Sequence, residues 1–442
     1  MVQQNTENSN SDNNEGLKRD IGVVGLGANV INSIVGGGIF VLPAIVAARL
    51  GSASILAYLI CGILIILIML CFAETGSRIT VSGGAYAYVE AAFGPFAGFL
   101  TNSLFWFGFG ILSDAAIANA MADILAIKIP WLNQQGYRAL FFLVVFSGFA
   151  WVNIRGVKQG VQMVKINTLA KLIPLLVLIT FGWFSTSSEN LEWTAWPSTS
   201  DLGEISLILF FAFGGGEIAL NTSGEIKNPR RTVPYGILVG IAIVIVLYIL
   251  IQTVSLGVLG SALSDHEGAP LVAVAEKLMG NFGATLIIVG SAVSIFGAIS
   301  GDILGYPRLL FAGSRNGLLP RFLSHVHNRF ATPYWAIIIY TVIVFIFSIT
   351  GGFKQLAIIS SAALLTIYLG VVLATIKFKL RNHSKGDGTF RIPGGLIIPV
   401  LALVAIIWFL SHLARNEALG IALFLGILSV VYFIMRFVKK RT

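Results

Sequence analysis

The chain has 442 residues, of which 56% are hydrophobic and 11% are charged, and its formal net charge is +9. So apolar a composition excludes a soluble globular protein with a charged surface. The basic residues are spread over many loops and do not gather on one face, so the positive charge does not indicate a nucleic-acid partner. The composition predicts an all-α, polytopic membrane protein embedded in a lipid bilayer.

The apolar residues fall into about twelve segments, each close to the roughly 20 residues that a helix needs to span the hydrocarbon core. The expected spans are 21–48, 53–74, 94–124, 137–154, 163–184, 203–222, 233–257, 283–312, 333–350, 355–377, 393–414 and 417–437. The polar, Asn-rich residues 1–20 contain no apolar run. We expect them to form a disordered cytosolic tail.

Most Lys and Arg residues fall in alternate loops, which places both termini in the cytosol by the positive-inside rule. The compact loops and the lack of a targeting signal favour a bacterial inner membrane. Cys61 and Cys71 lie in the same predicted helix, so no disulfide framework is expected.

Two glycine triplets interrupt the apolar segments. Gly36 to Gly38 lie in "INSIVGGGIFVLP", and Gly214 to Gly216 lie in "FFAFGGGEIALN". Each triplet lies in the first helix of a set of five, which predicts a five-plus-five inverted repeat over 21–184 and 203–377, with 393–437 outside it. Interrupted helices at matching places in two halves indicate a transport site. Close helix packing is the alternative, because small residues are common between membrane helices.

A broken helix would expose backbone groups that bind an amino acid. N–H groups after the first break would bind a carboxylate, and carbonyl groups at both breaks would accept hydrogen bonds from an ammonium group. The N–H groups are those of Gly37, Gly38 and Ile39, and the carbonyl groups are those of Ile34, Val35, Phe211 and Gly214.

Several motifs resemble the amino acid/polyamine/organocation permeases over nearly the whole chain after residue 20. They include "SGGAYAYVEAAFGP", "GEIKNPRRTVP" and "GDILGYPRLLFAGSRNGLLP". The resemblance implies that Gly36, Gly37 and Gly38 bind the substrate carboxylate, although the family has Ser or Ala more often at the middle position. It places an aromatic gate on Phe211 or Phe213. The family's arginine/agmatine exchangers have Trp at the position of Phe211, which disfavours that substrate.

Lys171 lies in the middle of the fifth predicted helix, in "LAKLIPLL". A Lys at a helix centre costs about 2.5–3.5 kcal/mol by insertion scales, so it requires a partner or a role. A snorkelling side chain is the simpler interpretation. The resemblance implies that this Lys takes the place of the sodium ion used by related carriers. Our hypothesis is that Lys171 changes its protonation or its contacts during transport, with a proton as coupling ion and no need for sodium.

Two carboxyl groups are further candidates, because a buried carboxylate can exchange a proton near neutral pH. Glu217 follows the second glycine triplet and could instead cap the break. Asp302 lies in the eighth predicted helix, where it could contact substrate or pair with a cation. Ser113 and Asp114 in the third helix are weaker candidates. The five His residues lack metal-ligand spacing and no phosphate-binding loop is present, so we expect no metal and no cofactor.

Together these features predict a secondary active transporter that takes up neutral amino acids with protons by alternating access. An amino acid exchanger is the second hypothesis. An ion channel is the rival from another class, since broken helices and carbonyl groups also build ion filters. An intramembrane enzyme is disfavoured, because no nucleophile, base and orienting group share a motif. The sequence makes no prediction of oligomeric state.

Overall fold

The structure is a computed structural model of the 442-residue chain. It describes residues 21–79, 84–156, 161–193, 195–217, 226–315, 317, 319–381 and 390–439, without the side chains of 161–167, 229–230 and 438–439. The predicted tail at residues 1–20 lies outside the described residues. Within the described residues the chain forms helices and loops, with one isolated parallel bridge between Ile21 and Ile226.

The helices follow one another along the chain with short connections. Their bounds are α1 (Val23–Ile34), η1 (Gly37–Phe40), α2 (Leu42–Leu50), α3 (Ser54–Arg78), α4 (Ala85–Phe93), α5 (Pro95–Ser103), η3 (Leu104–Ile111), α6 (Leu112–Ala126), α7 (Gln135–Ile154), α8 (Val161–Trp183), α9 (Thr199–Leu209), η6 (Phe210–Phe213), α10 (Pro229–Leu259), η8 (Gly260–His266), α11 (Pro270–Arg315), α12 (Tyr334–Thr350), α13 (Phe353–Leu380), α14 (Ile397–Ser411) and α15 (Arg415–Lys439).

Seven helical stretches among the described residues are long and apolar enough to cross a membrane: Leu42–Arg78, Pro95–Ala126, Gln135–Ile154, Arg231–His266, Pro270–Arg315, Phe353–Leu380 and Arg415–Phe437. Shorter apolar helices include α1 and α12. Large apolar side chains on the outer helices are exposed, such as Val404 on α14 and Leu423 on α15. Exposed apolar surface of this extent fits a lipid environment, and the all-α prediction is confirmed.

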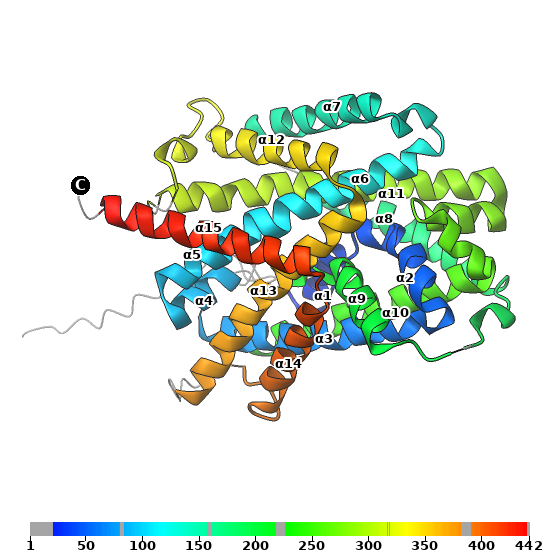
Figure 1. The fold of residues 1–442 in the computed structure, drawn as a ribbon, viewed down its shortest axis with the longest axis horizontal. Helices are drawn as coiled ribbons and strands as arrows, with labels where there is room; N and C mark the ends of the chain where they lie inside the picture. Colours follow the sequence, from blue (N-terminus) through cyan, green and yellow to red (C-terminus); the bar gives the residue numbers. More distant parts are fainter. Residues whose placement is uncertain are drawn as a thin grey trace, which may run out of the picture.

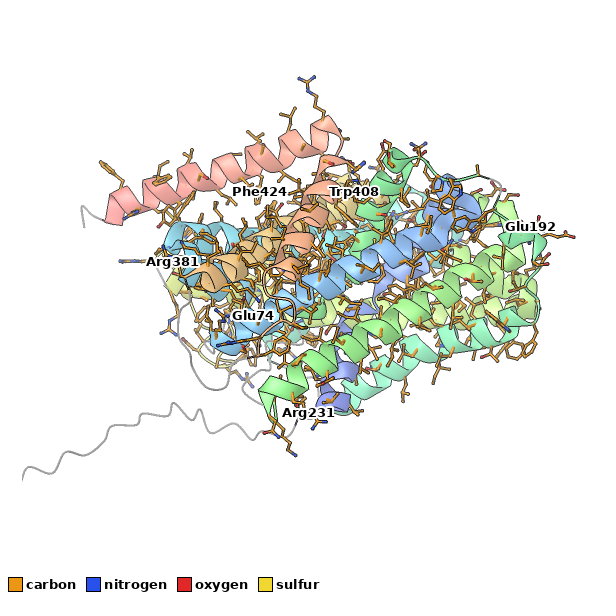
Figure 2. All side chains as sticks on the ribbon, turned by 90° about the horizontal axis from the view of Figure 1, so that it is seen from below. Glu74, Glu192, Arg231, Arg381, Trp408 and Phe424 are labelled. Atoms are coloured by element: carbon orange, nitrogen blue, oxygen red, sulfur yellow. The ribbon has the colours of Figure 1, made fainter. Side chains whose placement is uncertain are left out.

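Most of the long helices run along a common direction and form a layered bundle (Figure 1). On one side, α1 and α3 both pack against α10. On the other, α6 packs against α11 and α13, and α7 packs against α12. The side chains of Arg381 and Glu192 lie at opposite ends of this bundle (Figure 2). The two glycine triplets therefore lie between two packed groups of helices.

Two helices depart from the regular spans that the sequence predicts. The expected helix at 283–312 is part of α11, which begins earlier and bends at Gly280, where φ is +63°. Glycine is the residue that adopts this left-handed conformation without strain. The expected helix at 94–124 contains a π-helical segment, η3, between α5 and α6. Such segments change the direction in which the following side chains point and are frequent at functional sites.

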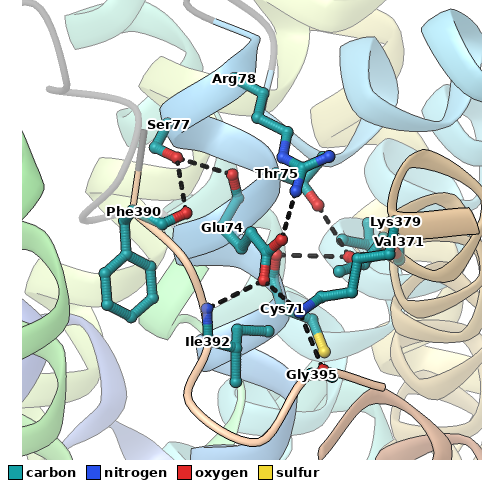
Figure 3. Close-up of polar contacts among 11 residues, drawn as sticks. Cys71, Glu74, Thr75, Ser77, Arg78, Val371, Lys379, Phe390, Ile392 and Gly395 are labelled. Carbon is teal, nitrogen blue, oxygen red and sulfur yellow. Dashed lines mark hydrogen bonds and ion pairs between the residues drawn. The ribbon is translucent and has the colours of Figure 1, made fainter. Parts of the chain in front are cut away.

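At the end of the bundle that holds Arg381, a buried carboxylate joins three segments (Figure 3). Glu74 on α3 accepts from Arg78 at 2.5 Å, from Lys379 on α13 at 2.8 Å and from the backbone N–H of Ile392 at 3.0 Å. Close by, the Thr75 and Thr375 hydroxyls hydrogen-bond at 2.7 Å. These bonds fasten α3 to α13 and to the loop before α14.

Candidate functional site: two broken helices and a buried acidic cluster

The first glycine triplet interrupts a helix, as the sequence predicts. α1 ends at Ile34, the next two residues are extended, and a 3-10 turn begins at Gly37. A Cβ atom on Gly37 would lie 2.8 Å from Ile117 Cγ2, and one on Gly38 would lie 3.1 Å from Phe211 Cδ1. The glycines therefore serve both functions that the sequence left as alternatives, since the helix is broken and its neighbours approach closely.

The second triplet also breaks its helix. After η6 ends at Phe213, Gly214 is extended and Gly215 has a φ of +100°. A Cβ atom on Gly215 would lie 2.7 Å from the carbonyl oxygen of Ser33 on α1. Only glycine fits this combination of left-handed backbone and close approach. The two breaks thus lie directly against each other, although their residues are far apart in the sequence.

Lys171 on α8 is held by the first break. Its Nζ donates to the carbonyl oxygens of Asn32 at 2.8 Å and Val35 at 3.0 Å, and its side chain is 3% exposed. Thr168, one turn earlier, donates to the Asn32 side chain at 2.9 Å. Lys171 therefore does not snorkel toward the membrane surface. It satisfies carbonyl groups that the end of α1 leaves without helical partners.

Tyr248 on α10 was not among the residues predicted from the sequence. Its hydroxyl lies 3.2 Å from the carbonyl oxygen of Ile34 and 3.0 Å from that of Ala212, so one phenol joins both breaks. Its position in the sequence could have identified it, because tyrosines in membrane helices concentrate near the membrane interfaces. Tyr248 instead lies within a long apolar run and is fully buried.

Three of the four carbonyl groups predicted to bind an ammonium group already hold donors. The carbonyl of Ile34 accepts from Tyr248, that of Val35 accepts from Lys171, and that of Phe211 accepts from the N–H of Gly214 at 3.4 Å. A carbonyl oxygen has two lone pairs. Each of these groups can therefore accept one further hydrogen bond from a ligand.

The two candidate gate residues have different surroundings. Phe211 packs edge-on against Phe353 at the start of α13, with ring centroids 5.8 Å apart, and lies over Gly38. Phe213 is fully buried and packs against Tyr248. Phe211 therefore covers the first break, whereas Phe213 supports the residue that joins the two breaks.

Glu217 interacts with the second break. Its carboxylate accepts from the Tyr368 hydroxyl and interacts with the backbone N–H of Gly215. The side chain is 3% exposed. This geometry matches the capping interpretation, in which the carboxylate satisfies N–H groups that the break frees.

Asp114 and Asp302 lie close together on α6 and α11. Asp114 is fully buried and its Oδ2 accepts from the Tyr340 hydroxyl at 2.9 Å. Asp302 is half-buried and lies within electrostatic range of Asp114, Lys171 and Glu217. Ser113 is half-buried beside Asp114. The candidate carboxyl groups from three separate segments thus meet around the breaks.

A cavity of about 580 Å³ opens at the N-terminal end of α1. It is lined by Ile21, Gly22, Val23, Val24, Gly25 and Asn29, and its lining contains none of the break residues. Asn29 lies one helical turn before Asn32, whose carbonyl accepts from Lys171. The cavity therefore lies at the start of α1, before the first break.

Comparison with known proteins agrees with this architecture. The family model described as amino acid permease matches residues 21–435. The chain is 31% identical to the serine/threonine exchanger SteT of Bacillus subtilis, over 96% of this chain and 98% of that protein. It is 27% identical to the methylthioribose transporter of the same organism, over 94% and 92% of the two chains.

A mammalian relative aligns over a shorter stretch. The mouse Asc-type amino acid transporter 1 is 30% identical over 73% of this chain and 63% of its own length. These relatives are transporters and not enzymes. The chain belongs to the amino acid permease family, within the amino acid/polyamine/organocation superfamily, and is a multi-pass membrane protein.

Proposed function

We propose that this protein is a secondary active transporter that carries amino acids by alternating access. The observation that carries the proposal is the meeting of two broken helices at Tyr248, whose hydroxyl contacts carbonyl groups of both breaks. The N–H groups of Gly37, Gly38 and Ile39, in the first turn of η1, would bind the α-carboxylate. Remaining lone pairs on the carbonyl groups of both breaks would accept from the α-ammonium group.

The relatives support an amino acid as substrate. SteT is a serine/threonine exchanger, and the Asc-type protein is an amino acid transporter. The human large neutral amino acids transporter small subunit 2 is 29% identical over 72% of this chain. These names favour neutral amino acids, as does Phe in place of Trp at position 211. The methylthioribose transporter shows that the substrate panel should include a non-amino-acid.

We propose that one of the two packed groups of helices moves against the other during transport. In this proposal α1, α3, α9 and α10 rock together against the remainder, because α1 and α3 pack on α10 and Tyr248 joins α10 to both breaks. The proposal includes twelve spans, the inverted repeats 21–184 and 203–377, and both termini in the cytosol of a bacterial inner membrane. Residues 393–437 would lie outside the repeat.

Proton symport is our first choice of coupling, and exchange is the second. Lys171 contacts the first break directly and lies within range of Asp302, so movement of α1 would change its surroundings without a sodium ion. Exchange is favoured by the relationship to SteT. An open ion filter is less consistent with the break residues, since Gly37, Gly38 and Ile39 are buried and Phe211 covers Gly38.

Purified protein in sodium-free liposomes distinguishes these modes. Uptake of labelled amino acids and methylthioribose is measured with an inward proton gradient, without it, and with amino acid inside the vesicles. Accumulation driven by the gradient supports symport, and uptake that requires internal amino acid supports exchange. No saturable uptake of any amino acid would contradict the proposed function, and ion currents without such saturation would indicate a channel.

A further inference from the structure

Among the residues that the structure describes, the carboxyl groups around the breaks outnumber the cations that face them. Asp114 on α6, Asp302 on α11 and Glu217 near the second break surround the same region as Lys171 on α8. In the described part of the chain, the other titratable groups that face the cluster are the phenols of Tyr306 on α11, Tyr340 on α12 and Tyr368 on α13. Three carboxylates and one ammonium group would leave this interior with excess negative charge.

Lys171 and Glu217 already have partners that account for their positions. Lys171 donates to two carbonyl groups at the end of α1, and Glu217 accepts from Tyr368 and interacts with Gly215. Glu217 Oε1, like Asp114 Oδ1, has no hydrogen-bond partner among the described residues, but Glu217 interacts with the backbone at Gly215. Asp114 differs because a second carboxyl group, that of Asp302, acts on it beside the Tyr340 hydroxyl. A second carboxyl group beside a buried carboxylate opposes its ionisation. The unexplained part of the cluster is therefore the pair Asp114 and Asp302.

One oxygen atom of this pair lacks a partner. Asp114 is fully buried and its Oδ2 accepts from Tyr340, but its Oδ1 has no hydrogen-bond partner among the described residues. An unpaired buried carboxylate oxygen is costly, and a neighbouring carboxyl group lowers this cost if a proton is held between the two groups. Because Asp114 has no exposed surface, a proton fits at this oxygen where a hydrated ion or a substrate group does not.

Asp302 provides a route to this buried position. It is half-buried, and its neighbours on α11, Gly301 and Gly305, are exposed with no atom within 4 Å of a Cβ atom built on either. The two residues therefore differ in access, because Asp302 keeps some accessible surface and Asp114 has none. A proton that enters through Asp302 can be held between the two groups.

We propose that Asp114 and Asp302 form the proton-binding site that couples transport in this protein, with one proton shared by the two carboxyl groups. This inference rests on the proposed transport function and assigns its coupling ion to a defined place. Lys171 remains protonated and acts by moving. When α1 moves, the ammonium group exchanges its contact with the Val35 carbonyl for one with Asp302, the carboxyl group of Asp302 ionises, and its proton passes to water.

The position of the π-helical segment supports this assignment. η3 ends at Ile111, directly before the turn of α6 that carries Asp114. A Cβ atom on Gly110 would lie 2.9 Å from the ring of Tyr306 and 3.0 Å from the hydroxyl of Tyr340. The local backbone therefore brings α6 close to both phenols that face the acidic pair.

Liposomes that contain a trapped pH dye and receive labelled amino acid test the proposal. Asp302→Asn and Asp114→Asn keep side-chain volume and remove the shared proton. We expect both variants to lose amino-acid-driven proton influx and gradient-driven accumulation, with a smaller loss of amino acid exchange at equal pH. Asp265→Asn, the same change at an exposed residue of η8, is the matched control and should behave as wild type.

Three results would overturn the assignment. Proton influx that persists in both Asn variants would place the proton elsewhere. An equal loss of exchange and of proton influx, in protein that remains folded, would make the pair a substrate contact. Amino acid uptake without proton movement in the wild type would overturn this inference but would not contradict the transport function. A wild type that transports no amino acid would contradict the proposed function itself. If Asp114→Asn does not fold, the half-buried Asp302→Asn variant decides alone.

Discussion

Two buried acidic groups in this protein differ in how fully their charge is compensated. Glu74 has Arg78 on one oxygen, and Lys379 and the Ile392 N–H on the other (Figure 3). Asp114 has one phenol on one oxygen, and no hydrogen-bond partner on the other among the described residues. Both side chains are almost inaccessible to solvent. The residue type is similar, but the surroundings differ.

The difference distinguishes a carboxylate that holds segments together from one whose charge its surroundings do not compensate. A buried ion pair holds segments together when its hydrogen bonds are complete, and removal of one member leaves an uncompensated charge. An incompletely paired buried carboxyl group reduces stability and persists where it binds a ligand or a proton. Glu74 therefore fastens α3 to α13, whereas Asp114 has the environment that our proposal of a proton-binding site requires.

The largest effect on activity is expected from Lys171→Ala. The change removes the donor to the carbonyl groups of Asn32 and Val35 and the cation that interacts with Asp302. We expect uptake into liposomes to be lost. Lys354→Ala, at an exposed residue at the start of α13, is the control. Full uptake with unchanged pH dependence in Lys171→Ala would remove this residue from the mechanism.

Glu74→Gln should have the largest effect on stability. It leaves Arg78 and Lys379 without their carboxylate, and loss of one member of a buried pair costs about 3 kcal/mol at the lower end of the usual range. The lower end applies because both cations are partly exposed. Thermal unfolding in detergent measures the loss. We expect the folded fraction to transport normally, and an unchanged unfolding temperature would contradict the structural role.

Tyr248→Phe removes the hydroxyl that joins the two breaks and keeps the ring that packs on Phe213. Loss of one such hydrogen bond costs about 1 kcal/mol. We expect slower transport at little cost in stability, measured as initial rates and unfolding temperatures. Tyr58→Phe is the matched control, since its hydroxyl bonds Gln252 and neither break. Equal rates in the two variants would show that joining the breaks has no special role.

Asp114→Asn should have the smallest effect on stability and so sharpens the comparison with Glu74. The amide oxygen can still accept from Tyr340, and no cation is left unpaired by the change. We expect the unfolding free energy to stay within about 1 kcal/mol of wild type, the usual size of one hydrogen bond. A loss as large as that of Glu74→Gln would show that Asp114 is a structural residue.

The breaks could be predicted from the sequence because adjacent glycines in an apolar run are a local signal. Lys171 could be predicted for the same reason, since a charge within a membrane helix is visible without a partner. Tyr248 and the pairing of Asp114 with Tyr340 could not. Helices that are apolar on every side give no periodic signal for the face that points inward, and Asp114 and Tyr340 lie 226 residues apart.

Glu74 also escaped prediction for a physical reason. It lies near the end of α3, one turn before Arg78, where a charge is ordinary for a helix that leaves the membrane. Its burial depends on Lys379 and on the backbone at Ile392, which the chain brings close only after folding. Local sequence therefore reveals charges in unusual places more readily than charges that tertiary structure buries.

The claim that the two breaks bind both ends of an amino acid has a direct test. Exchange of a labelled amino acid in liposomes is measured in competition with the free amino acid, its methyl ester and its N-acetyl derivative. If the N–H groups after Gly36 bind the carboxylate and the carbonyl groups bind the ammonium group, only the free amino acid competes. Equal competition by the ester or the N-acetyl derivative would contradict the account.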